Sequence, residues 1–186
     1  MNRLTDIAWL ALCAVWAVGA VTTKRTARTI PLGQVVQHTA ILLFAVAVLL
    51  APPFRRGPLG WRVLPDGAWV EAAGDALQIA GIAFCIWARL HLGRNWSGMV
   101  DVKQDHALIR SGPYAFVRHP IYTGLLLAIL GKAVEHNQAG GLVAFAILTV
   151  EWKRKSLIEE RLMVDQFGAR YHRYRAEVKG LIPGVW

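Results

Sequence analysis

The sequence predicts an all-α integral membrane protein with about five transmembrane helices, the last two forming a helical hairpin, followed by a cytosolic amphipathic helix at the C-terminus. Hydrophobic residues make up 55% of its 186 residues, whereas soluble domains are about 45–50% apolar. Apolar stretches also recur at the roughly 20-residue length that a helix needs to cross a bilayer. We therefore treat residues 1–186 as one membrane domain.

Three membrane helices are expected within residues 1–92, at about 6–23, 34–53 and 68–92. The first could instead be a cleaved signal peptide, because it is apolar and ends in small residues. Only Arg3 precedes it, however, and Asp6 adjoins its apolar run, so we favour a retained helix.

The third of these segments carries polar residues at the spacing of one helix face. The members of this face are Glu71, Asp75, Gln78, Ile82, Cys85 and Arg89. A carboxylate facing lipid at mid-bilayer costs on the order of 2.5–3.5 kcal/mol, so we expect the face to point at protein. Alternatively, Glu71 and Asp75 lie among lipid headgroups and pair with Arg55, Arg56 or Arg62.

Residues 93–186 are expected to hold a polar loop, the hairpin and the C-terminal helix. The hairpin's apolar arms, about 120–134 and 139–152, flank the turn sequence EHNQAG. The basic run at 153–155 and the basic tail place the C-terminus in the cytosol. Five helices then put loop 24–33 on the same side, although the basic loop 54–67 falls on the other.

The tail from 153 to 176 has apolar and aromatic residues close to one helix face. They are Ile158, Leu162, Phe167, Tyr171 and Tyr174. We expect this amphipathic helix to lie at the membrane surface, packed on residues 106–122.

Charge and composition exclude several classes of function. The net charge is +9, but basic residues lie between and after apolar segments instead of forming one basic face, so nucleic-acid binding is not expected. Cys13 and Cys85 lie inside apolar segments, and the six histidines lack an HExxH or similar spacing. We therefore predict no metal.

Two polar motifs on the predicted cytosolic side are separated by the hairpin: DHALIRSGPYAFVRHPIYTG at 105–124 and EWKRKSLIEERL at 151–162. With the later F-G-x-x-Y-x-x-Y at 167–174, this arrangement resembles the isoprenylcysteine carboxyl methyltransferases and the integral-membrane methyltransferases related to them. The resemblance covers about 93–176, nearly half of the chain. It implies a multi-pass enzyme with its active site facing the cytosol and S-adenosylmethionine as cofactor.

The same resemblance assigns cofactor-binding positions. They are His106, Ala107, Leu108, Ile109 and Tyr114 in one wall, His119, Pro120, Ile121 and Tyr122 in a second, and Glu159 for the ribose hydroxyls or amino group. A tyrosine face near a sulfonium gains cation–π attraction of roughly 0.5–2 kcal/mol. Glu160 points about 100° away from Glu159 around a helix and is expected to support the fold.

The resemblance implies a lipophilic or prenylated acceptor from the membrane lipid phase, and carboxyl O-methylation of an isoprenylcysteine-like substrate is the most direct prediction. Lys155 stands where the family has an arginine that meets the substrate carboxylate, and a one-residue helical shift could let the adjacent Arg154 serve instead, so the resemblance makes both catalytic candidates. Because lysine lacks the planar fork of arginine, the acceptor class stays open.

Three alternatives remain at this stage. One is a phospholipid or small-lipid N- or S-methyltransferase, since related enzymes share the RHPxY and EE features. Another is an NADPH-dependent membrane lipid reductase, because such enzymes have similar FGxxYxxY segments. The third is a membrane scaffold or transporter, which should show internal repeats or polar residues along several helices.

Overall fold

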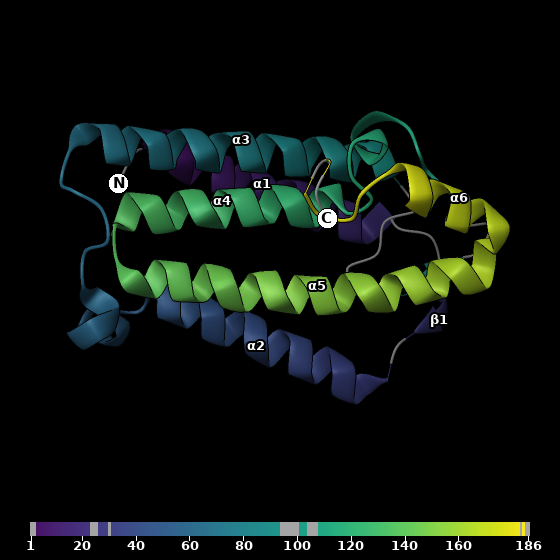
Figure 1. Ribbon diagram of the computed structural model, residues 1–186, viewed down its shortest axis with the longest axis horizontal. Coiled ribbons are helices and arrows are strands. Elements are labelled where there is room, and N and C mark those ends of the chain that lie inside the picture. Colours follow the sequence, from purple (N-terminus) through teal and green to yellow (C-terminus); the bar gives the residue numbers. More distant parts are fainter. Residues whose placement is uncertain are drawn as a thin grey trace.

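The computed structural model describes residues 3–22, 26–29, 31–93, 101–103, 108–182 and 184. Helices α3, α4 and α5 lie side by side, α1 packs on α3, and α2 crosses α5 (Figure 1). The helices are α1 (Arg3–Thr22), α2 (Leu32–Leu50), α3 (Ala68–Leu92), α4 (Pro120–His136), α5 (Ala139–Phe167) and α6 (Ala169–Glu177). Short 3-10 turns are η1 (Pro52–Arg55), η2 (Gly57–Gly60) and η4 (Gly112–Ala115).

Within the part of the chain that the structure describes, three helices are long and apolar enough to cross a membrane: Arg3–Val21, Leu32–Leu50 and Ala68–Leu92. They correspond to the three spans predicted for residues 1–92. The predicted helical hairpin is also present, since α4 and α5 pack against each other and are joined at residues 137 and 138. That the hairpin itself crosses the bilayer stays a prediction.

The predicted boundary between the hairpin and the C-terminal helix is wrong. Helix α5 continues through position 153 to Phe167, because residues 153–167 contain no glycine or proline that would end a helix. It ends at Gly168, whose φ of 50° suits glycine, and α6 follows. The aromatic face of the tail is therefore split between two helices, with Tyr171 and Tyr174 buried.

One short two-stranded ribbon departs from the all-α prediction. Strand β1 (Thr26–Thr29) pairs antiparallel with β2 (Asp101–Lys103), so that Arg28 lies opposite Val102. The ribbon joins the segment after α1 to the segment after α3. This places both segments at the same end of the helices, as the predicted topology requires.

Helices α3 and α4 pack closely through glycines that face each other. A Cβ atom added to Gly81 would lie 2.5 Å from the carbonyl oxygen of Gly124, and one added to Gly74 would lie 2.7 Å from that of Gly131. Small residues allow such close backbone approach between membrane helices. This contact holds the end of α3 beside the start of α4.

The polar face of α3 points at protein for part of its length, as predicted. Gln78 is buried, accepts a hydrogen bond from Trp9 Nε1 at 3.0 Å and donates one to Glu135 Oε2 at 2.8 Å. Cys85 and Arg89 are buried as well. Glu71 is exposed, so the expectation that it faces protein is wrong.

We predict that Gly81→Ala destabilises the protein by about 1–3 kcal/mol, because the new methyl group would overlap backbone atoms of α4. Gly33→Ala in α2 is the matched control, since an added Cβ there would meet no atom within 4 Å apart from the adjoining residues and backbone of its own helix. Thermal unfolding in detergent micelles would measure both. Equal stability of the two variants would contradict close packing of α3 on α4.

Candidate active site

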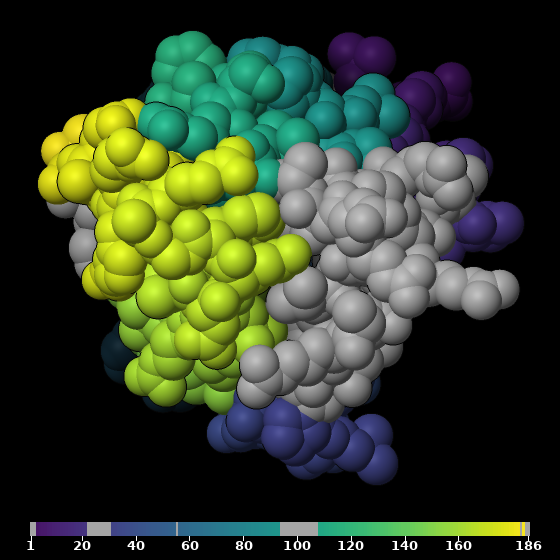
Figure 2. Space-filling view, turned by 90° about the vertical axis from the view of Figure 1, so that its right-hand side faces the viewer, coloured from purple at the N-terminus to yellow at the C-terminus, as the bar shows by residue number. Residues whose placement is uncertain are grey.

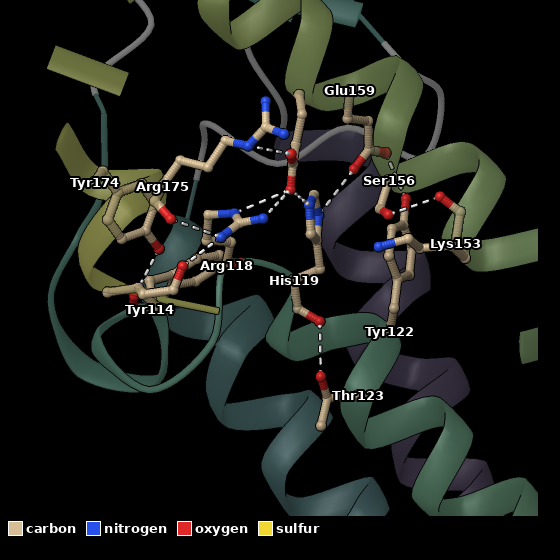
Figure 3. A network of polar contacts seen from close by, with 12 residues as sticks. Tyr114, Arg118, His119, Tyr122, Thr123, Lys153, Ser156, Glu159, Tyr174 and Arg175 are labelled. Atoms are coloured by element: carbon tan, nitrogen blue, oxygen red, sulfur yellow. Dashed lines mark hydrogen bonds and ion pairs between the residues drawn. The ribbon is translucent and has the colours of Figure 1, made fainter. Parts of the chain in front are cut away.

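The candidate site lies where α4 begins, beside the second half of α5 and α6. Figure 2 shows this end of the molecule, with the residues of α5 and α6 in yellow lying against green residues that precede α4. Figure 3 shows the polar side chains that meet there. They come from the motif before α4, from the start of α4, from α5 and from α6.

The motif before α4 folds over the end of α3. Gly112 has a φ of 58°, and a Cβ atom there would lie 2.8 Å from the His91 ring, so both conformation and space require glycine. His91 Nε2 lies 2.9 Å from Ser111 Oγ. This packing buries Tyr114, whose ring stacks on His91 and whose hydroxyl lies 3.5 Å from the carbonyl of Ala88.

The C-terminal segment returns to hold the backbone next to the site. The amides of Arg118 and His119 donate hydrogen bonds to the carbonyls of Lys179 (2.8 Å) and Gly180 (3.0 Å). Thr123 Oγ1 donates to the carbonyl of Leu181 at 2.6 Å. These contacts fix the peptide of His119 immediately before α4.

The carboxylate of Glu160 is buried and contacts cations from two segments, the residues just before α4 and helix α6. Arg118 donates to Oε1 through Nε (2.9 Å) and Nη2 (2.7 Å), His119 Nε2 lies 3.1 Å from the same oxygen, and Arg175 Nε lies 3.5 Å from Oε2. Burial opposes the charge, but hydrogen bonds from His119 and Arg118 outweigh it and lower the pKa of Glu160 to about 2.

His119 lies between two carboxylates. Its Nδ1 is 3.4 Å from Glu159 Oε2, while Nε2 faces Glu160. Burial disfavours the imidazolium, but the hydrogen bonds to Glu159 and Glu160 prevail, so the pKa of His119 is raised. Burial likewise opposes ionisation of Glu159, and the contact with His119 outweighs it and lowers the pKa of Glu159.

Aromatic rings lie beside His119 and Glu159. Tyr122 donates a hydrogen bond to Glu159 Oε1. The Tyr122 ring stacks on His119 with centroids 5.7 Å apart and on Trp152 with centroids 6.0 Å apart. Trp152 is buried, so it fixes the position of the Tyr122 ring.

Only one of the two basic candidates on α5 faces this group. Lys155 lies one helical turn before Glu159, and its Nζ is 5.6 Å from the centroid of the Tyr122 ring. Arg154 is instead held by Glu151, with Nε and Nη2 at 2.9 and 2.6 Å from its oxygens. His38 of α2 also binds Glu151, at 2.8 Å.

The structure thus brings together His119, Tyr122, Glu159 and Lys155 of the predicted site residues. Other predicted positions point elsewhere: the side chain of Tyr114 faces α3, Pro120 is buried, and Ile121 packs against the core between α1, α3 and α4. Leu108 and Ile109 are half-buried ahead of η4. His106 and Ala107 lie outside the described residues.

Several members of the site were missed as site residues in the sequence. They are Arg118, Trp152, Arg175 and the backbone of residues 179–181. The RHP motif, which includes Arg118, was the available signal for that residue. Trp152 lies two helical turns before Glu159, so its spacing from Glu159 could have indicated that both lie on one face of α5. Nothing in the sequence indicated that the chain returns after α6.

A hollow of about 360 Å³ lies between α5 and α6. Its lining residues are Leu157, Glu160, Arg161, Val164, Asp165, His172 and Arg175. It therefore borders Glu160, whereas His119 is not one of its lining residues. Among the residues that the structure describes, no group of three or more His, Cys, Asp or Glu is arranged to hold a metal ion.

Comparison with known proteins identifies the family. Residues 69–170, more than half of the chain, match the family model described as phospholipid methyltransferase. The chain belongs to the phospholipid methyltransferase family. The resemblance to isoprenylcysteine methyltransferases is confirmed by a protein-S-isoprenylcysteine O-methyltransferase of Schizosaccharomyces pombe, 34% identical over 101 residues, which covers 52% of this chain and 42% of the relative.

The name of another relative indicates a small thiol as its methyl acceptor. Methanethiol S-methyltransferase 1 of Bradyrhizobium diazoefficiens is 28% identical over 163 residues, covering 80% of this chain and 55% of the relative. The chain spans about half the length of the curated relatives it matches. Different members of the family thus carry names for different acceptors.

A solved structure shares the fold. It is that of the eukaryotic intramembrane Ras methyltransferase, an isoprenylcysteine carboxyl methyltransferase, with a TM-score of 0.59 and 24% identity over 80% of this chain and 53% of that one. The helical membrane architecture predicted from the sequence is therefore that of a known methyltransferase fold.

We predict that Glu160→Gln destabilises the protein by about 3–5 kcal/mol, because it leaves Arg118, whose side chain is only 10% exposed, and its neighbours without their counter-charge. The contribution of the Glu160 charge is present above pH 4.5 and is lost as the pH falls toward about 2. The variant should therefore lose less stability than the wild type over this acidic range.

Unfolding followed between about pH 2 and pH 7 in micelles would measure both effects. Glu177→Gln is the control, because Glu177 forms an exposed ion pair with Arg110, worth about 0–1 kcal/mol. If Glu160→Gln were no more destabilising than the control, the Glu160 cluster would not support the fold.

Proposed function

We propose that this protein transfers a methyl group from S-adenosylmethionine to a lipophilic acceptor at the cytosolic membrane face, most directly to the carboxyl group of an isoprenylcysteine-like substrate. The observation that carries the proposal is the group formed by His119, Tyr122, Lys155 and Glu159 at one end of the apolar helices. Membership of a methyltransferase family supports it. The NADPH-dependent reductase is set aside, because the relatives are named methyltransferases.

The residues present suit this cofactor. S-Adenosylmethionine carries a sulfonium, an ammonium and ribose hydroxyls, and an ionised carboxylate beside an aromatic ring can bind such groups. The Glu159 side chain is 25% exposed, whereas that of Glu160 is 6% exposed. Glu159 is thus the carboxylate that would hold the cofactor, with the Tyr122 ring beside it.

When bound, the cofactor supplies an electrophilic methyl group on a sulfonium. The protein's own contribution is positioning and electrostatics. Trp152 and His119 hold the Tyr122 ring from both sides, and the Lys155 ammonium places positive charge where an anionic acceptor can approach. A carboxylate acceptor is already ionised at neutral pH, so it requires no general base.

The orientation of the site follows from the charge pattern. Helix α5 carries the basic run 153–155 on the site side of its apolar half, and cytosolic segments are enriched in lysine and arginine. The ribbon β1–β2 lies at this same end. A membrane acceptor would reach the site from lipid, and the cofactor would reach it from the cytosol.

A second candidate is S-methylation of a small thiol, and two observations favour it. Lys155 offers a single charge where the family has an arginine fork. The match to methanethiol S-methyltransferase 1 also extends over 163 residues, compared with 101 for the fission yeast isoprenylcysteine enzyme.

We predict that Glu159→Gln weakens binding of S-adenosylmethionine at least tenfold, since the cofactor's cationic and hydroxyl groups lose an ionised partner. Calorimetric titration of the purified chain in detergent would measure this, with NADPH as the control ligand. Glu177→Gln, which removes an exposed carboxylate, should bind as the wild type does. Unchanged affinity in Glu159→Gln, or binding of NADPH alone, would refute the proposal.

We predict that Lys155→Ala raises the Michaelis constant for a farnesylcysteine analogue several-fold with little change in cofactor affinity, and that Lys155→Arg lowers it, because arginine binds a carboxylate at two points. Arg170→Ala, at an exposed position, is the control. Radiolabelled methyl transfer to farnesylcysteine and to methanethiol would be compared. If Lys155→Arg changed neither, Lys155 would not meet the acceptor.

A further inference from the structure

We infer that His119 exchanges its proton for the sulfonium charge of the cofactor: S-adenosylmethionine binds with release of the Nδ1 proton of His119, whereas the product S-adenosylhomocysteine, whose sulfur is a neutral thioether, binds without it. This rests on the proposed function. It adds that the relative affinity of the protein for the two ligands depends on pH, and that this dependence comes from the side chain of His119.

The first observation is the position of the imidazole. Both ring nitrogens face carboxylate oxygens, Nδ1 at 3.4 Å from Glu159 and Nε2 at 3.1 Å from Glu160. A neutral imidazole has one donor only, so satisfying both contacts requires the imidazolium. The raised pKa of His119 agrees with this geometry.

The second observation is that the two carboxylates are not equivalent. Glu160 is bound by Arg118 and Arg175 as well as His119 and is buried. Glu159 receives the Tyr122 hydroxyl and the longer contact from Nδ1, and it is the more exposed of the two. A cation arriving at Glu159 therefore competes with the Nδ1 proton, while the Nε2 proton stays on Glu160.

The third observation is the charge of the surroundings. The groups that face this pair are the cations of Arg118, Lys153, Lys155 and Arg175 and the hydroxyls of Tyr114, Tyr122 and Tyr171. The hydroxyls stay neutral near pH 7. Counting His119, five cations thus meet two carboxylates, and a further positive ligand is repelled unless one proton leaves. Arginine does not release a proton, and His119 contacts both carboxylates directly, so we assign the released proton to His119.

The chemical steps balance. On binding, the Nδ1–H bond breaks, its electron pair stays on nitrogen, and the proton passes to solvent. On methyl transfer, the acceptor's electron pair forms the new bond to carbon, the carbon–sulfur bond breaks, and its pair stays on sulfur. The sulfonium becomes a neutral thioether, so one positive charge leaves the cofactor and the imidazole can take up a proton again.

Titration calorimetry of the full chain in micelles tests this. S-Adenosylmethionine and S-adenosylhomocysteine would be titrated in phosphate and in Tris, whose ionisation enthalpies differ, between about pH 6 and pH 9. We expect S-adenosylmethionine to release up to about one proton on binding. Below the raised pKa of His119, its affinity should therefore increase up to about tenfold for each unit by which the pH is raised. The second should release fewer protons, so that its relative affinity is highest at low pH.

Single substitutions identify the residue that releases the proton. His119→Gln should abolish the difference in proton release, Lys155→Gln should keep it, and exposed His172→Gln should match the wild type. Equal proton release by the two ligands at every pH in the wild type would overturn the inference even if His119→Gln did not fold. Loss of the difference in Lys155→Gln but not in His119→Gln would also overturn it. Failure of the wild type to bind either ligand would refute the proposed function, and the inference with it.

Discussion

The buried carboxylate of Glu160 is the interaction on which the site end of the molecule depends. An ion removed from water is tolerated only when charges and hydrogen bonds replace its hydration. Glu160 obtains them from Arg118 and His119 before α4 and from Arg175 in α6. Arg118 also donates to the carbonyls of Arg175 and Val178, so one carboxylate joins α4, α5, α6 and the returning C-terminus.

A different constraint operates between the apolar helices. Lipid tails are as apolar as the side chains that would face them, so helices in a bilayer associate through close packing and hydrogen bonds. The facing glycines of α3 and α4 provide the first, and Gln78 with Trp9 and Glu135 provides the second. His119 lies at the boundary between the charged cluster and the apolar helices. Its ring contacts Glu160, and its backbone occupies the N-cap position of α4.

How far the sequence predicts this structure depends on the range of the interaction involved. Helix positions follow from apolar length and periodicity, which are local, and the three N-terminal spans were predicted in this way. The pairing of Arg28 with Val102 and the return of residues 179–181 to His119 join distant segments, and no local pattern encodes them. The motif likewise identified His119, Tyr122 and Glu159 but not the direction of each side chain, so Tyr114 and Ile121 proved to face α3 and its neighbours.

Two adjacent glutamates on one helix illustrate how burial distinguishes two identical side chains. A step of about 100° around α5 turns Glu160 toward Arg118 and Arg175 and leaves Glu159 toward Tyr122, His119 and Lys155. The first carboxylate is fully committed to protein cations, whereas the second is held by a hydroxyl and by the more distant imidazole nitrogen. Partners that are easily replaced suit the ligand-binding role that we propose for Glu159, and the many fixed contacts of Glu160 hold this part of α5 in place.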